Sequence, residues 1–247
     1  MLAPELYDRI GTGYREYRRS DPRIMAAIAT ALSGCQTVLN VGAGTGSYEP
    51  MDRYVVAVEP SETMIRQRRA DTAPVVRASA MNLPFADGSF DAALALLTVH
   101  HWPDQMRGLR EMLRVANRCI VFTWDCSNAG MWLTQDYFPE IADQGKTIFH
   151  PVDFYREAFG QIRIVTIPVP HDCTDGFLQA YWRRPEAYFD PGVRGAISAF
   201  AHVKNVGIGL SRLRCDLDDG TWHKRHGHLL GDTEMDLGYR LVISTER

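Results

Sequence analysis

Short apolar runs alternate along the chain with segments whose apolar residues recur every three to four positions. The apolar runs lie at 38–41, 55–58, 75–78, 92–97, 119–125, 162–169 and 237–243. Continuous apolar runs of this length are typical of strands that are buried on both faces of a parallel sheet. The segments between them predict helices that pack on that sheet. The pattern therefore predicts an α/β fold: a seven-stranded, mostly parallel sheet with helices on both faces.

Several helices can be placed by their start signals and their apolar stripes. Asp21 precedes Pro22, a pair that is typical of the first turn of a helix. Ile24, Ile28 and Ala31 follow at helical spacing and predict the buried face of that helix. Further helices are predicted from Ser61 onward, over 103–116 and over 151–159.

The first apolar run ends in three glycines at alternate positions, Gly42, Gly44 and Gly46. Glycine permits a tight turn there, and it lets backbone N–H groups approach a ligand. The second run ends on Glu59, whose carboxylate can accept hydrogen bonds from both hydroxyls of a ribose. The layout therefore indicates a nucleoside site. Its G-x-G-x-G spacing differs from the dinucleotide fingerprint G-x-G-x-x-G, because the third glycine comes one position early.

The glycine turn and the following acid resemble motifs I and II of the class I S-adenosylmethionine (SAM) methyltransferases, which share a Rossmann-like seven-stranded sheet. The resemblance implies that SAM is the cofactor. It places at the cofactor the residues Tyr14, Arg18, Gly42, Ala43, Gly44, Gly46, Glu59, Pro60, Met64, Ser79, Ala80, Met81, Leu97 and Thr98.

Residues 7–19, rich in tyrosine and arginine, resemble the leader that many small-molecule methyltransferases fold over the SAM site. The resemblance implies that Tyr14 and Arg18 meet the methionine end of SAM, with Arg18 pairing with its carboxylate. A solvated, flexible start of the chain is the alternative interpretation. For Met64, which the resemblance places against the adenine, the alternative is an ordinary core methionine.

The chain departs from the family pattern at three places. Asn40 replaces an acid, and Ser79 stands where an Asp commonly accepts from the adenine amino group. Adenine recognition is therefore expected to rest more on backbone groups around Ala80 and Met81. The crossover between the first two strands, 47–53, is shorter than the dozen or so residues that a parallel crossover usually needs.

The segment 83–104 resembles the methyltransferase type 11 subgroup, which includes the C-methyltransferases of ubiquinone and menaquinone biosynthesis. In that subgroup a His-His-aromatic segment follows the fourth strand, as His100, His101 and Trp102 do here. Imidazole titrates near neutrality, so either histidine can act as a general base or orient a substrate; His101 is preferred. The structural alternative is that one histidine anchors the loop and the other packs against Trp102.

Composition narrows the function classes. The formal net charge is −3 and no long block of Lys or Arg occurs, which argues against a protein that holds nucleic acid through its phosphates. No apolar run approaches the 18 or so residues of a membrane span, and no signal peptide is evident. The five cysteines form no close pair, which favours reduced thiols in a cytoplasmic protein.

Some sixty residues separate the last two predicted strands, and a loop of that length must build structure of its own. We expect a lid and first helix over 1–36, a SAM-binding core over 37–173, a helical insertion over 174–231 and the last strand within 232–247. The insertion is rich in aromatic residues and arginine. These side chains could line a site for a flat or anionic small substrate, or they could pack a helical cap.

His223, His226 and His228 have a spacing that could hold zinc, but no cysteine or carboxylate pattern supports a closed site, so no metal is expected.

The sequence thus predicts a SAM-dependent methyltransferase (EC 2.1.1.-) that acts on an O, N or C atom of a small molecule. A non-catalytic SAM-binding or regulatory protein and an NAD-dependent Rossmann oxidoreductase are the alternatives. The acceptor atom, the need for a general base and the oligomeric state stay open.

Overall fold

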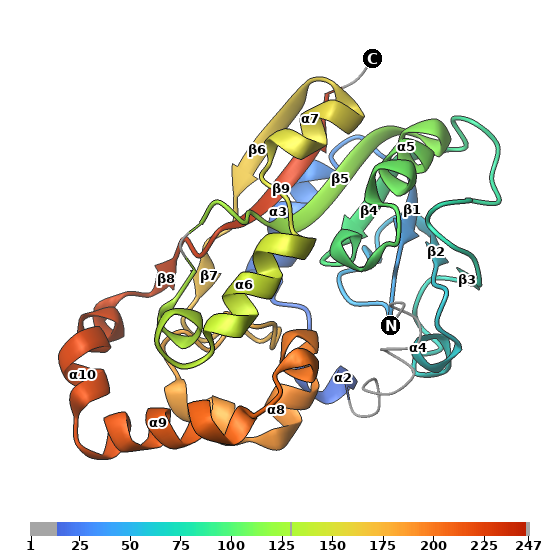
Figure 1. Ribbon diagram of the computed structural model, residues 1–247. Helices are drawn as coiled ribbons and strands as arrows, with labels where there is room; N and C mark the ends of the chain where they lie inside the picture. The colour runs from blue at the N-terminus through green and yellow to red at the C-terminus, as the bar shows by residue number, and fades with distance from the viewer. Residues whose placement is uncertain (1–13, 129, 246–247) are drawn as a thin grey trace.

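The computed structural model describes residues 14–128 and 130–245. Its main sheet has seven strands in the order β3-β2-β1-β4-β5-β9-β6 (Figure 1). The strands are β1 (Thr37–Val41), β2 (Tyr54–Val58), β3 (Val75–Val76), β4 (Phe90–Leu96), β5 (Ala116–Trp124), β6 (Ile162–Thr166) and β9 (Tyr239–Ser244). β9 runs antiparallel to its neighbours β5 and β6, and the other pairs are parallel. The predicted seven-stranded, mostly parallel α/β sheet is confirmed.

Alternate residues of the central strands bury into two separate clusters, one on each face of the sheet. Helix α3 (Pro22–Ala31) packs Ile24 and Ile28 against one face. Helices α5 (Gln105–Val115) and α7 (Asp153–Phe159) cover the other face, where Leu109 and Met112 are fully buried. Helices therefore lie on both faces, as predicted. No described helix has the length and apolarity needed to cross a bilayer.

The short connection between β1 and β2 is held by a buried ion pair. The Glu49 carboxylate accepts from Arg68 Nη2 at 2.7 and 2.9 Å, from the Ala73 amide at 3.0 Å and from Asn40 Nδ2 at 3.2 Å. Both charged side chains are nearly inaccessible, at 7% and 4% exposure. This network anchors the short connection between the two strands. The following helix α4 (Glu62–Arg66) is capped by Ser61, as predicted.

The expected insertion lies between the two strands of a small ribbon, β7 (Val169–Pro170) and β8 (Glu234–Met235). Its elements are η3 (Pro185–Phe189), α8 (Pro191–Gly195), η4 (Ser198–His202), α9 (Val206–Asp218), α10 (Thr221–His226) and η5 (Gly227–Gly231). They lie together at one end of the molecule, on the side of α6 (Pro139–Ile148) and the π-helix η2 (Leu133–Tyr137) (Figure 1). The division into lid, core and insertion as separate units stays a prediction.

Aromatic residues, most of them from the insertion, form much of the core at that end. Trp182, Tyr188 and Trp222 are fully buried, and Trp132 packs edge-on against Trp222 at 5.4 Å between ring centroids. Trp132 Nε1 also donates to the Trp182 carbonyl at 2.7 Å. For these residues, packing is therefore the interpretation that the structure supports.

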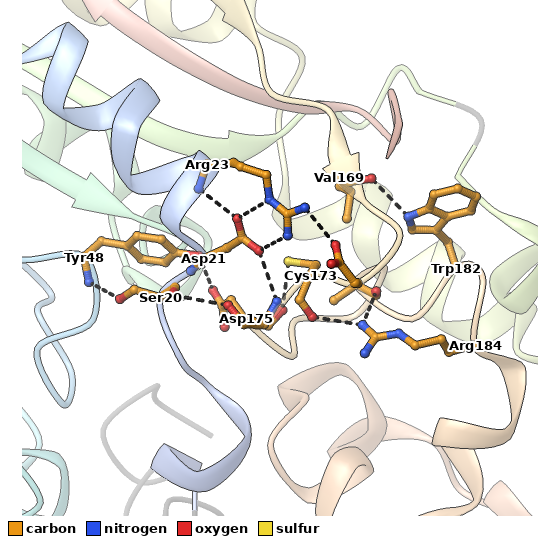
Figure 2. A network of polar contacts seen from close by, with 12 residues as sticks. Ser20, Asp21, Arg23, Tyr48, Val169, Cys173, Asp175, Trp182 and Arg184 are labelled. Atoms are coloured by element: carbon orange, nitrogen blue, oxygen red, sulfur yellow. Dashed lines mark hydrogen bonds and ion pairs between the residues drawn. The ribbon is translucent and has the colours of Figure 1, made fainter. Parts of the chain in front are cut away.

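A polar network around the buried Asp21 connects the segment before α3 to the start of the insertion (Figure 2). The Asp21 carboxylate caps α3 and also accepts from the Thr174 amide at 3.2 Å. Arg23 bridges Asp21 and Asp172, each at 2.7 Å. The hydrogen bonds from Arg23 hold the pKa of Asp21 at about 2, against the effect of burial. Asp21 is therefore ionised throughout the neutral range.

Candidate functional site

A cavity of about 250 Å³ lies where the carboxyl ends of β1, β2 and β4 meet. Its walls are the glycine turn after β1, the residues that follow β2, the segment 79–81 and the loop after β4. The predicted cofactor residues that line it are Arg18, Gly42, Ala43, Gly44, Glu59, Pro60, Met64, Ser79, Ala80, Met81, Leu97 and Thr98. Gly46 and His100 are absent from this wall. Tyr14 begins the short helix α2 (Tyr14–Tyr17), and its side chain lies outside the described part of the structure.

The glycine turn differs from the expectation that its amides face a ligand. The N–H groups of Gly42 and Ala43 both donate to the Val58 carbonyl, at 2.8 and 3.0 Å, and that of Gly46 donates to the Ala43 carbonyl. The Gly44 N–H donates to Glu59 Oε2 at 2.8 Å. The amides of Gly42, Ala43 and Gly44 thus bind Val58 and Glu59 at the end of β2, so these three residues contribute shape rather than free donors to the cavity.

Conformation and crowding explain the need for glycine at two of these positions. Gly42 has φ of 71°, and a Cβ there would lie 2.2 Å from Thr98 Oγ1. Gly44 has φ of 53°, and its Cβ would lie 3.3 Å from Met64 Cε. A side chain at either position would strain the backbone and press on a residue that lines the cavity.

Glu59 is 6% exposed and is held from two sides. Oε2 accepts from the Gly44 amide and Oε1 from the Ser61 amide, both at 2.8 Å. A carboxylate oxygen has acceptor capacity beyond one hydrogen bond. A fixed carboxylate in the cavity wall therefore fits the two hydroxyls of a ribose, which the adenosyl group of SAM carries.

Ser79 and Met81, on the opposite side, are linked by a long hydrogen bond from the Met81 amide to Ser79 Oγ, at 3.4 Å. Met64, 3% exposed, completes an apolar wall close to the glycine turn. A flat base can lie against such methionines.

A second cavity, of about 700 Å³, adjoins the first and shares Arg18, Leu97 and His101 with it. Leu97 has φ of 51°, a left-handed conformation that is uncommon for a residue other than glycine. Backbone strain of this kind gathers at functional sites. The place where the two cavities meet is thus the position at which a donor group in one could reach an acceptor in the other.

Both histidines of the predicted pair lie at this second cavity. Their rings are 3.9 Å apart between centroids, and His100 stacks on Phe149 at 4.1 Å. Burial, with help from the positive charge of Arg18, lowers the pKa of His101 to about 4 and that of His100 well below its usual value. Both imidazoles are therefore neutral near pH 7, and each retains a ring nitrogen that can accept a proton.

Arg18 pairs with a protein carboxylate: its Nε lies 2.5 Å from Asp175 Oδ1. Asp175 is 1% exposed and also accepts from the Tyr48 hydroxyl at 3.0 Å. The five guanidinium donors allow Arg18 to bind a second carboxylate as well. Its predicted pairing with the carboxylate of SAM stays a prediction.

Sequence reasoning missed several residues of the smaller cavity, namely Thr45, Ser47, Tyr48, Leu96, Trp102, Pro103 and Phe122. Their motif neighbours could have indicated Thr45, Ser47 and Trp102, but Phe122 belongs to a strand whose contribution only the tertiary structure reveals. Among the described residues no three His, Cys, Asp or Glu side chains converge on one point. Of the histidine-rich segment, His226 pairs with Asp136 at 2.8 Å.

Comparisons with known proteins agree with this geometry. A family described as a methyltransferase domain matches residues 39–118. The crystal structure of a putative methyltransferase from an antibiotic biosynthesis pathway of Anabaena variabilis is 31% identical, with a TM-score of 0.86. That similarity covers 94% of this chain and 100% of the other.

Two curated relatives are similar over shorter stretches. A demethylmenaquinone methyltransferase of Corynebacterium urealyticum is 40% identical over 82 residues, which are 32% of this chain and 36% of that protein. The tRNA (carboxymethyluridine(34)-5-O)-methyltransferase ALKBH8 of Mus musculus is 23% identical over 129 residues, 49% of this chain and 19% of that protein. The matched part of this chain thus spans well under half the length of either relative.

Proposed function

The chain belongs to the class I SAM-dependent methyltransferases, and we propose that it transfers the methyl group of SAM to an O, N or C atom of a small molecule bound in the larger cavity. The observation that carries this proposal is that the two cavities meet at Arg18, Leu97 and His101. SAM supplies an activated methyl group bonded to a sulfonium sulfur. The protein's main task is then to align donor and acceptor.

Under this proposal, Glu59 accepts hydrogen bonds from the ribose hydroxyls. Met64 and Met81 flank the adenine, and Arg18 faces the methionine end. Each of these side chains lines the smaller cavity, which supports the assignment. The larger cavity holds the acceptor, with its reacting atom at the His101 side.

We propose that His101 accepts the proton that an O–H, N–H or C–H acceptor loses during transfer, with His100 supporting its ring. His101 lies at the boundary of both cavities and is neutral near pH 7, so it can accept a proton there, although its lowered pKa makes it a weaker base than an ordinary imidazole. Substituting His101 by Gln should lower kcat by about 100-fold, within the usual range for a general base, while the Kd for SAM stays within about twofold. Unchanged kcat in this variant would return His101 to a structural role.

A small-molecule substrate is favoured over a nucleic acid. The net charge is −3, and three of the six arginines of the insertion bind protein carbonyls: Arg183 that of Asp232, Arg184 those of Cys173 and Ala180, and Arg194 that of Tyr188. Similarity to the tRNA methyltransferase covers 19% of that protein.

All five cysteines are free thiols, which supports the proposed cytoplasmic location.

Titration calorimetry with SAM and NAD, followed by incubation with labelled SAM and a panel of phenols, amines and quinones, tests this proposal. We expect SAM to bind, NAD not to bind, and label to appear in at least one product. NAD binding without SAM binding would favour the oxidoreductase alternative. SAM binding with no transfer to any compound of the panel would favour the non-catalytic alternative.

A further inference from the structure

The larger cavity has a composition that restricts what it can hold. Resting on the proposed function, we infer that the methyl acceptor is an uncharged, ring-bearing molecule that carries a hydroxyl or amine hydrogen-bond donor. The cavity volume of about 700 Å³ is within the range of pockets that enclose drug-sized ligands. Four observations carry the inference: the origin of the walls, an aromatic wall, the balance of charge and one acceptor without a donor.

Most of the walls come from four separate parts of the chain. They are the loop after β4, the end of β5 with the loop that follows, the helix α6 with Phe149, and the insertion around Phe177 and Ile197. The walls are completed by Arg18, by Thr134 and Gln135 of η2, and by Tyr239 of β9. Apolar surface predominates over polar surface in this lining. The insertion thus closes over a cavity that begins at the cofactor side of the sheet.

One wall consists of three stacked or edge-packed rings. Phe149 stacks on His100 at 4.1 Å with 27° between the planes, and Trp124 meets Phe149 edge-on at 5.5 Å. The Trp124 indole is fixed by a hydrogen bond from Nε1 to the Leu237 carbonyl at 2.8 Å. Rings held in this way offer a preformed face to another ring, at little entropic cost.

Charge is balanced within the lining. Arg18 pairs with Asp175, and the other lining residues that are charged at neutral pH, Asp143 and Lys146, are exposed and opposite in sign. Arg18 is already paired with Asp175 and is assigned to the methionine end of SAM, so a charged substrate would lose its hydration without gaining a further counter-ion deep in the cavity, which is costly. Of the two interpretations that the sequence left open for the insertion, packing is the one that fits Arg184, whose guanidinium donates to two protein carbonyls.

Gln179 supplies the polar feature. It lines the cavity, is 2% exposed, and its Oε1 has no hydrogen-bond partner among the described residues. A buried acceptor without a donor costs free energy, which a substrate hydroxyl or amine would recover. The same argument disfavours an acceptor molecule that lacks any donor.

The test uses calorimetric titration of the full chain, saturated with S-adenosylhomocysteine, with four probes. 2-Naphthol has a flat ring system and a donor. Naphthalene lacks the donor, 2-naphthoate replaces the donor with a negatively charged acceptor, and decahydro-2-naphthol keeps the donor but loses the flat rings. We expect 2-naphthol to bind at least fivefold more tightly than each of the others. Equal or tighter binding of 2-naphthoate or of decahydro-2-naphthol, or no binding of 2-naphthol, would overturn the inference.

Two variants of cavity residues, with one control variant outside the cavity, test whether 2-naphthol binds where we propose. Phe149→Leu should weaken 2-naphthol about fivefold, within the range expected for losing one aromatic pair. Phe154→Leu is the matched control, because Phe154 also stacks on a histidine, His150 at 3.9 Å, but lies outside the cavity; its affinity for 2-naphthol should not change. Gln179→Met should weaken 2-naphthol and leave naphthalene unaffected. Equal effects of the Phe149 and Phe154 substitutions, or equal effects of Gln179→Met on both probes, would contradict the assignment.

The affinity for S-adenosylhomocysteine, measured in the same experiment, separates two kinds of failure. If this compound does not bind, the proposed function fails. If it binds while the probes rank differently from the expected order, the inference about the acceptor fails alone.

Discussion

The two adjoining cavities are built in different ways. Nearly all of the smaller one comes from residues 40–103, from the ends of strands and the segments that follow them. The larger one gathers residues from 18 to 239, with α6 and the insertion supplying most of its wall. A site built from neighbouring turns can be recognised as a motif in the sequence. A site built from helices that are distant in the sequence has no such motif, and only the residue composition of those helices indicates it. The difference explains why the cofactor can be predicted and the substrate cannot.

The largest expected effect concerns the ion pair that holds the short crossover. Arg68→Met removes the partner of Glu49 and leaves a buried carboxylate, so we expect a loss of about 3–5 kcal/mol in the free energy of unfolding. Urea denaturation measures it. Arg66→Met is the control, because Arg66 pairs with Glu62 at the exposed surface, and it should cost about 0–1 kcal/mol. Similar losses in both variants would show that the crossover does not depend on the buried pair.

The second-largest effect is expected for Gly42→Ala. A Cβ at this position meets Thr98 Oγ1 and the residue also has positive φ, so crowding adds about 1–3 kcal/mol to the backbone strain. We expect SAM affinity to fall by at least tenfold. Gly34→Ala has a similar φ, 82°, but its Cβ would meet nothing within 4 Å, so it carries the strain without the crowding. Loss of SAM affinity in the Gly34 variant as well would mean that global stability, and not the shape of the turn, is responsible.

Glu59→Ala sharpens the comparison between the cavities. We expect SAM to bind about 1–3 kcal/mol more weakly, the range for losing hydrogen bonds to a charged group, while 2-naphthol affinity stays the same. Calorimetry with both ligands checks this. Glu62→Ala, an exposed acid on α4, should change neither affinity. An unchanged affinity for SAM in Glu59→Ala would show that Glu59 does not bind the ribose hydroxyls.

The smallest expected effect is a pH dependence of the free energy of unfolding that arises from His101, at the boundary between the two cavities. Because His101 has a pKa of about 4 in the folded protein and about 6.5 when unfolded, the unfolded chain binds the additional proton between these values. Stability contributed by the neutral form is complete above pH 6.5 and is lost as the pH falls toward 4, by about 1.4 kcal/mol between pH 7.5 and 5.5. Urea unfolding at both pH values should show a smaller difference in His101→Gln. An identical pH dependence in the variant would contradict the lowered pKa.

Much of the fold followed from pattern alone, because buried parallel strands are continuous apolar runs and Gly42, Glu59 and Thr98 stand directly at their ends. Two features did not follow. The amides of the glycine turn bind Val58 and Glu59, which depends on how β2 lies beside β1. The role of Arg184 depends on the carbonyls that tertiary packing brings to it, and no spacing in the sequence encodes that.

A crystal structure with S-adenosylhomocysteine tests the central claim most directly. We predict that the ribose hydroxyls bind Glu59, that the base lies between Met64 and Met81, and that the sulfur faces the boundary formed by Leu97 and His101. Density for the compound outside this cavity, or a sulfur directed away from the larger cavity, would contradict the account.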